Sequence, residues 1–202
     1  PAKPVIEKLD FDFASCGYAL CIVDTGGSHS DLTDEYAAVR KEMESVAEYL
    51  GKSVLREVDE DEFMKNIADI RSSCGDRAVL RAMHFYGDNA RVEKQAAALK
   101  AGDFETFKKY IIESGRSSYM YNQNVYSCKK ASEQPVSLAL SLSEKLLDGC
   151  GAWRVHGGGF AGTIQAFVPL NKLDEYKDLM EKVFGSGSCY ILSVRPVGGV
   201  EL

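Results

Sequence analysis

The feature that most constrains this fold is a stretch with four glycines in six positions. The sequence RVHGGGFAGT, residues 154–163, contains Gly157, Gly158, Gly159 and Gly162. It lies between the runs AWRV and TIQAFV, whose length and β-branched and aromatic content predict strands. A plain hairpin turn requires only one or two glycines. The extra ones predict a hairpin whose backbone approaches another segment closely or offers N–H groups to an anion.

The spacing G-x-G-x-x-G within this stretch is shared with several nucleotide-binding loops, but its neighbours exclude three of them. A dinucleotide-binding loop requires a helix directly after the glycines, whereas TIQAFVP continues as a strand. A Walker loop requires Gly-Lys-Ser/Thr, which is absent. A protein-kinase cover loop requires V-A-I-K, H-R-D and D-F-G partners, and the chain has none. The residues alone leave two alternatives, a functional loop or a tight packing corner.

An earlier strand and a helical segment precede this hairpin. The apolar run YALCIVDT, residues 18–25, predicts a buried strand. Apolar residues at intervals of three and four then predict helices, with glycine or proline at most of their ends. The expected helices cover about 33–50 with Thr33 or Ser30 as N-cap, 59–71 with Asp59 as N-cap, 77–101, a segment after the N-cap Asp103, and 135–148 with Leu138, Leu142 and Leu146 facing inward. Residues 114–132 have no clean period, which predicts a loop or short helix.

The last fifty residues alternate strands and a helix. The two strands around the glycines are followed by an apolar helical stripe on Leu173, Tyr176, Met180 and Val183, and then by the strand CYILSV. The chain is therefore expected to be α+β, with a helical middle segment, and to form a single domain over residues 1–202. Because it begins at Pro1 rather than methionine, we expect it to be a fragment of a longer protein.

Composition excludes several classes of function. The formal net charge is −6 without a basic run, which argues against nucleic acid as a partner. No apolar run approaches the roughly 20 residues that span a bilayer, and no signal peptide is evident, so no membrane is expected as a partner and the chain is expected to be cytoplasmic. Six scattered cysteines without a C-x-x-C pair predict reduced, mostly buried thiols and no metal site.

Three further features have an ordinary structural interpretation. Asp24-Thr25-Gly26 is typical of an aspartic protease, but such enzymes need two aspartates and only one copy is present. Tyr36 lies in the first turn of its helix, where a core aromatic is the usual interpretation. His29, His84 and His156 are widely separated, which favours structural or surface roles, although His156 adjoins the glycines and could donate to an anion.

Three segments taken together carry a family resemblance. They are HSDLTDEYAAVRKEMESVA, then RAMHFYGDNARV followed by LKAGDFETF, and finally GAWRVHGGGFAGTIQAFV. Their order and spacing resemble the C-terminal half of the galactokinases, which are GHMP small-molecule kinases, from about residue 20 to 195. The resemblance implies a GHMP-kinase C-terminal-domain-like fold, with a ferredoxin-like split β-α-β sheet and a helical middle segment.

The same resemblance implies roles for particular residues. The family's glycine-rich G-G-G-F-G-G hairpin, which approaches the nucleotide and phosphoryl-transfer region, corresponds to residues 157–162. The sugar-site tyrosine of the family's S-S-E-Y stretch corresponds to Tyr36 in TDEYAAVRK. Substrates would be ATP and a monosaccharide. Mg²⁺, the main ATP loop and the catalytic aspartate would belong to an N-terminal part of the same chain, so no catalytic residue is expected within residues 1–202.

Departures from the family pattern leave alternatives open. Ala161 replaces a family glycine, and SGRSS stands where many members have Ser-His. The expected reaction is therefore phosphorylation of galactose or a related monosaccharide at its anomeric hydroxyl by the longer protein, with the fragment alone inactive. The alternatives are a non-catalytic sugar sensor derived from a galactokinase, and a GHMP kinase for another small molecule.

Overall fold

The computed structural model describes residues 6–9, 11–27 and 32–194 and shows one four-stranded sheet. Its strands are β1 (Tyr18–Asp24), β2 (Ala152–His156), β3 (Thr163–Pro169) and β4 (Cys189–Leu192). They lie in the order β2-β3-β1-β4, and every neighbouring pair is antiparallel. The helical segment connects β1 to β2, and one helix connects β3 to β4. This topology confirms the expected ferredoxin-like split β-α-β sheet within an α+β fold.

The helices agree with most of the expected ranges. They are α1 (Thr33–Tyr49), α2 (Glu60–Lys65), α3 (Ile67–Cys74), α4 (Asp76–Lys100), α5 (Phe104–Ser117), α6 (Pro135–Leu147) and α7 (Leu173–Phe184). The segment expected to be a loop or short helix continues α5 to Ser117 and then forms a π-helical turn, Ser118–Asn122. Among the described residues, no helix is both long and apolar enough to cross a bilayer.

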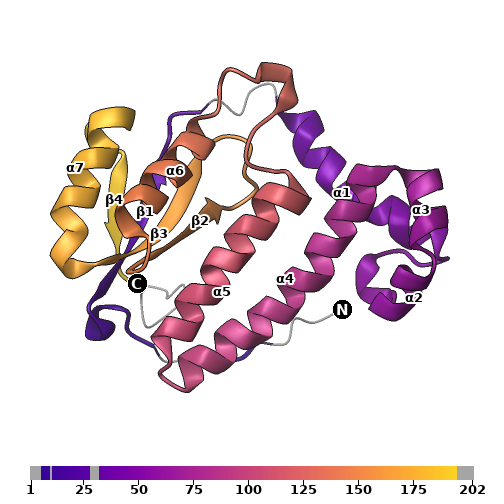
Figure 1. The fold of residues 1–202 in the computed structure, drawn as a ribbon, viewed down its shortest axis with the longest axis horizontal. Helices are drawn as coiled ribbons and strands as arrows, with labels where there is room; N and C mark the ends of the chain where they lie inside the picture. The colour runs from indigo at the N-terminus through magenta and orange to yellow at the C-terminus, as the bar shows by residue number, and fades with distance from the viewer. Residues whose placement is uncertain (1–5, 10, 28–31, 195–202) are drawn as a thin grey trace, which may run out of the picture.

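Alternate side chains of the strands point to opposite faces of the sheet, and each face has its own hydrophobic core. On β1, Ala19, Cys21 and Val23 face the core under α6 and α7, whereas Tyr18 and Leu20 face an aromatic cluster beside α5. Figure 1 shows α4 and α5 as a long helical hairpin, with α2 and α3 at the end of the molecule away from α7. The sheet is thus covered by helices on both faces, as burial of its two apolar faces requires.

The aromatic cluster forms around Phe167 of β3. Its ring centroid lies 5.1 Å from that of Phe107 and 5.0 Å from that of Phe13, and the ring is 4% exposed. Phe104 joins at the start of α5, where Asp103 accepts a hydrogen bond from the Thr106 amide at 3.0 Å, as expected of an N-cap. The cap therefore fixes the point at which α5 begins to pack on the sheet.

Two helix expectations are wrong in detail. Thr33 does not cap α1: it is the first helical residue, Leu32 holds the N-cap position without a side-chain bond, and Ser30 lies outside the described residues. The helix expected over 59–71 has the Asp59 cap but is two helices, because the chain breaks at Asn66.

The inward face of α6 agrees only in part with the expected one. Leu142 and Leu146 are partly buried and pack against the sheet core, as expected, whereas Leu138 is 47% exposed. The fully buried positions are Val136, Ala139, Ser143 and Leu147. Ser143 can lie inside because its hydroxyl donates to the Ala139 carbonyl at 2.8 Å and lies 2.9 Å from the Tyr176 hydroxyl.

The cysteines are less buried than expected. Cys21 and Cys189 are buried, Cys128 is exposed, and the other three have intermediate exposure. All six are free thiols. The sheet core buries its two cysteines because β1 and β4 point them toward α7.

Replacing Phe167 by alanine should remove the centre of the aromatic cluster. We expect the free energy of unfolding to fall by about 3–5 kcal/mol, because the large-to-small change leaves a cavity that the neighbouring rings cannot fill. The measurement is urea denaturation followed by circular dichroism. Leu170→Ala is the control, since Leu170 is 50% exposed and its truncation should change stability by no more than about 0.5 kcal/mol. Equal losses in the two variants would contradict this account of the core.

Candidate functional site

The glycine hairpin, which is the loop of residues 157–162 between β2 and β3, contacts the first turn of α1. The Tyr36 hydroxyl donates to the Gly159 carbonyl oxygen at 2.7 Å. The Tyr36 ring meets the Phe160 ring edge to face, with centroids 5.3 Å apart. The structure thus brings together Tyr36 and the hairpin, although more than 120 positions separate them in sequence.

Two of the glycines are explained by close approach. A Cβ atom on Gly158 would lie 2.7 Å from the Tyr36 ring, and one on Gly159 would lie 1.8 Å from the Asn124 carbonyl oxygen. Gly159 also has a positive φ of 81°. No side chain fits at either position without movement of its neighbours, so close packing accounts for these two residues.

Backbone N–H groups on the hairpin divide into two sets. The amide of Phe160 donates to the Asn124 carbonyl at 2.6 Å, and that of Ala161 donates to the Gly159 carbonyl at 2.7 Å. Within the described part of the chain, the amides of Gly157, Gly158 and Gly159 donate to no protein acceptor. Gly157 and Gly158 are exposed, whereas Gly159 is buried. Two successive free amides therefore lie at the surface, where they are suitable donors for an anion-binding nest.

Asn124 supports the hairpin from behind, and sequence reasoning missed it. Its side-chain amide donates to the Gly158 carbonyl at 3.2 Å, and its backbone carbonyl accepts from Phe160. The residue is 5% exposed, and its Oδ1 atom has no partner among the described residues. Phe160 has a positive φ of 59°, which is costly for a bulky residue and marks the hairpin as held in place by its contacts. The only sequence signal was the asparagine-rich YNQN, whose residues tolerate such turns.

The aspartic-protease-like motif has a structural role. The buried Thr25 donates to the Gly162 carbonyl through both its amide, at 2.9 Å, and its hydroxyl, at 2.6 Å. The Asp24 carboxylate accepts from the Gly26 amide at 2.9 Å and so stabilises the turn that follows β1. These bonds fix one end of the hairpin to β1.

A buried charged group connects α1 to the segment that carries Asn124. Arg81 of α4 is fully buried; its Nη1 donates to the Glu42 carboxylate at 2.8 Å and its Nε donates to the Asn122 carbonyl at 3.0 Å. Burial lowers the pKa of Arg81, and Glu42 opposes that shift. Removing one partner of such a pair would leave an uncompensated buried charge. Arg81 therefore holds α1 and the Asn122–Asn124 segment in one position.

Two cavities adjoin these groups. One of about 620 Å³ is lined by the hairpin residues Phe160 and Ala161, by Thr25–Gly27, and by the start of α6. The other, of about 380 Å³, is mainly apolar and includes Tyr36 and Phe85 in its lining. Both volumes suit small molecules rather than macromolecules.

The protonation state of Tyr36 suits a hydrogen-bond donor. Burial raises the pKa of its phenol, and the nearby Ala161 amide lowers it by a smaller amount. The hydroxyl is therefore neutral at physiological pH and can donate, as it does to Gly159.

The two histidines that the structure describes, His84 and His156, have local hydrogen-bond partners. His84 is buried with its Nδ1 2.9 Å from the Ser117 hydroxyl, and burial lowers the pKa of its imidazole. His156 is exposed at the end of β2 and pairs with Gln165 at 3.1 Å, while His29 lies outside the described residues. No group of three or more His, Cys, Asp or Glu side chains in the described ranges is arranged to hold a metal ion.

Comparison with known proteins gives a consistent set of relatives. No protein-family model matches the chain. The chain is 31% identical to galactokinase from Homo sapiens over 184 residues, which is 91% of the chain and 44% of that protein. It is 26% identical to galactokinase from Actinobacillus pleuropneumoniae serotype 5b (strain L20), over 81% of the chain and 41% of the relative.

A solved structure shares the fold. The crystal structure of Lactococcus lactis galactokinase complexed with galactose superposes with a TM-score of 0.65 at 21% identity, covering 88% of this chain and 45% of that one. The chain thus spans less than half the length of each of these relatives.

Gly159 and Gly157 provide a matched test of the close approach. Both have positive φ, 81° and 70°, so alanine at either position should cost about 1–2 kcal/mol of backbone strain. Only at Gly159 would the new Cβ meet Asn124; nothing lies within 4 Å at Gly157. We expect Gly159→Ala to lower the free energy of unfolding by a further 1–3 kcal/mol or so. Urea denaturation of both variants is the measurement, and indistinguishable midpoints would show that the hairpin is not held against Asn124.

Proposed function

This chain is related to the galactokinases over most of its length, and we propose that it is the C-terminal domain of a galactokinase-like sugar kinase. The longer protein would transfer the γ-phosphoryl group of ATP to the anomeric hydroxyl of galactose or a related monosaccharide. The chain would supply the wall that positions the sugar and the phosphates, and the remainder of the protein would supply the catalytic carboxylate.

The observation that supports this proposal best is the contact between Tyr36 and the glycine hairpin. Each was assigned a role by family resemblance, one beside the sugar and the other beside the phosphates, and phosphoryl transfer requires those two ligands to meet. In this fold the Tyr36 hydroxyl lies 2.7 Å from the Gly159 carbonyl oxygen. A packing corner alone does not require free amides on three consecutive glycines.

The proposed roles follow from the atoms available. The neutral Tyr36 phenol would exchange its bond to Gly159 for one to a sugar hydroxyl, which fixes the orientation of the ring. The free and exposed amides of Gly157 and Gly158 would donate to phosphate oxygens. Phosphoryl transfer depends on positioning and on stabilising charge spread over those oxygens, and a rigid hairpin provides both without covalent chemistry.

We assign Mg²⁺ and the main phosphate loop to the part of the longer protein that this chain does not span, as the family resemblance implies. Mg²⁺ is usually held by one or two carboxylates together with substrate phosphates. Among the described residues, no cluster of three or more carboxylate, thiol or imidazole side chains is present.

Replacing Tyr36 by phenylalanine in the longer protein tests the sugar role. Loss of one neutral hydrogen bond should raise the KM for galactose by about 2–10-fold, while the KM for ATP stays within twofold or so of the parent value. Steady-state assays of ADP release measure both constants. Tyr49→Phe is the control, because Tyr49 lies at the far end of α1 and is 43% exposed. An unchanged galactose KM would refute contact between Tyr36 and the sugar.

The 202-residue chain alone should not phosphorylate galactose. It should fold, because each face of its sheet buries an apolar cluster. We assign the catalytic carboxylate to the part of the longer protein that this chain does not span. The same ADP-release assay, run in parallel on the longer protein, gives the comparison. ATP-dependent phosphorylation by the chain alone would overturn the division of roles, and a longer protein that binds galactose without turnover would favour the sugar-sensor alternative.

A further inference from the structure

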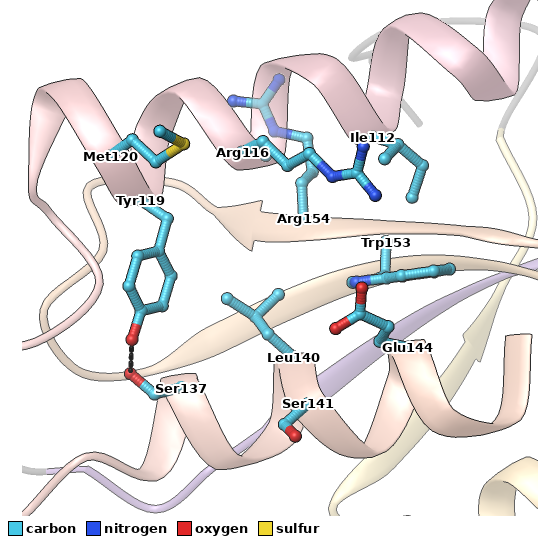
Figure 2. A pocket seen from close by; sticks show the side chains of 11 residues that line it. Ile112, Arg116, Tyr119, Met120, Ser137, Leu140, Ser141, Glu144, Trp153 and Arg154 are labelled. Carbon is cyan, nitrogen blue, oxygen red and sulfur yellow. Dashed lines mark hydrogen bonds between the residues drawn. The ribbon is translucent and has the colours of Figure 1, made fainter. Parts of the chain in front are cut away.

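A cleft of about 330 Å³ lies between α5 with its π-helical turn and α6, and the indole of Trp153 forms its floor (Figure 2). Neither Tyr36 nor any residue of the glycine hairpin lines it. The cleft is therefore separate from the proposed kinase site, and a ligand bound in it would not require the kinase function.

The cleft follows from the position of β2 at the edge of the sheet. Helix α5 packs on one face of this strand and α6 on the other. At Gly115, α5 lies so close to the strand that an added Cβ would be 3.1 Å from the Trp153 carbonyl oxygen and 3.0 Å from the Arg154 Cβ. Two helices held close to one edge strand leave a narrow opening along that edge, into which Trp153 projects.

Polar groups without protein partners surround the indole. Arg116 of α5 and Glu144 of α6 project from opposite lips. Figure 2 shows the Glu144 carboxylate beside the Trp153 ring and the Arg116 guanidinium on the α5 side of β2. In the part of the chain that the structure describes, neither charged side chain forms a hydrogen bond or ion pair, and the indole N–H has no acceptor. The other end is closed by Tyr119, whose hydroxyl lies 3.5 Å from that of Ser137.

We propose that this cleft binds a neutral monosaccharide in its pyranose form. A pyranose has an apolar C–H face that can pack on the half-buried indole, and hydroxyl groups at its edge that both donate and accept. Glu144 would accept from these hydroxyls, and Arg116 and the indole N–H would donate to them. The third charged lining residue, Arg154, donates to the Val155 carbonyl at 3.3 Å and interacts with Asp88. The unpaired charges are therefore one positive and one negative, on opposite lips, which favours a ligand without net charge. The volume is at the small end of ligand pockets, as a single ring requires.

A flat nucleobase fits the cleft less well. Both of its faces are aromatic, and stacking would be strongest between two planar groups. Near Trp153, however, the lining residues Ile112 and Leu140 are aliphatic, and the other aromatic lining residue, Tyr119, lies at the far end of the cleft (Figure 2). A ring bound at Trp153 would therefore meet an aromatic surface on one face only, which suits a ring with one apolar face.

Trp153 is the only tryptophan of the chain, so its fluorescence reports on this cleft alone. The experiment titrates the 202-residue chain, shown to be folded by a cooperative thermal transition, with galactose, glucose, the open-chain polyol sorbitol, and adenosine. We expect a saturable change in emission with at least one pyranose and none with sorbitol, because sorbitol has similar hydroxyls but no ring face.

Variants then identify the binding residues. Arg116→Ala and Glu144→Gln should each weaken the pyranose titration by about tenfold, the usual effect of losing a hydrogen bond to a charged group. Both side chains are exposed, so neither change should unfold the chain. Glu93→Gln, an exposed change on α4, is the matched control and should leave the titration unaltered. Tyr36→Phe should also leave it unaltered, which separates this cleft from the proposed substrate site.

The remaining outcomes would overturn the proposal. These are no saturable response to either pyranose, an equal response to sorbitol, saturation by adenosine alone, or titrations that Arg116→Ala and Glu144→Gln leave unchanged. A response abolished by Tyr36→Phe would assign the sugar to the other site and equally reject the cleft.

Discussion

The rest of the candidate site depends on the close contact between Gly159 and the Asn124 carbonyl. A side chain at this position would overlap that oxygen. The hairpin can therefore lie against the Asn122–Asn124 segment only if residue 159 is glycine. Once it does, Phe160 donates to Asn124, and the Gly159 carbonyl is presented to Tyr36. The glycines can therefore serve both for close packing and for ligand binding. The close approach fixes the backbone of the hairpin, and the amides that take no part in this contact stay free to bind a ligand.

Around this contact, the protein forms a closed ring of hydrogen bonds. Tyr36 and Glu42 lie on the same helix; Tyr36 bonds to the hairpin, and Glu42 bonds to Arg81. Arg81 bonds to Asn122, two residues before Asn124, which returns to the hairpin. A fully buried arginine is costly to desolvate. Arg81 nevertheless fixes the distance between α1 and the Asn122–Asn124 segment, which lie far apart in the sequence. Such rigidity is what positioning of two substrates requires.

Strand β2 adjoins both the glycine hairpin and the cleft that contains Trp153. The C-terminal end of the strand continues into the glycine hairpin. Near its N-terminal end, the Trp153 side chain lines the cleft between α5 and α6. The cleft arises because the strand lies at the edge of the sheet and pairs with β3 alone among the described strands. Glycine allows a close backbone approach at each place. At Gly159 any side chain would overlap the Asn124 carbonyl, whereas at Gly115 an added Cβ would make a tight contact of 3.0 Å with the Arg154 Cβ.

Local patterns in the sequence were sufficient for the strands, most helix limits, the Asp59 and Asp103 caps and the glycine hairpin, because these depend on neighbours within a few residues. The family resemblance added Tyr36 and the sheet topology. Only the tertiary structure showed the roles of Asn124 and Arg81 and the exposure of Leu138. Each depends on a partner more than thirty positions away or on a buried serine that finds its own acceptor, and no local period records such contacts. The sequence thus indicated which segments belong to the candidate site, and only packing determined which of their atoms meet.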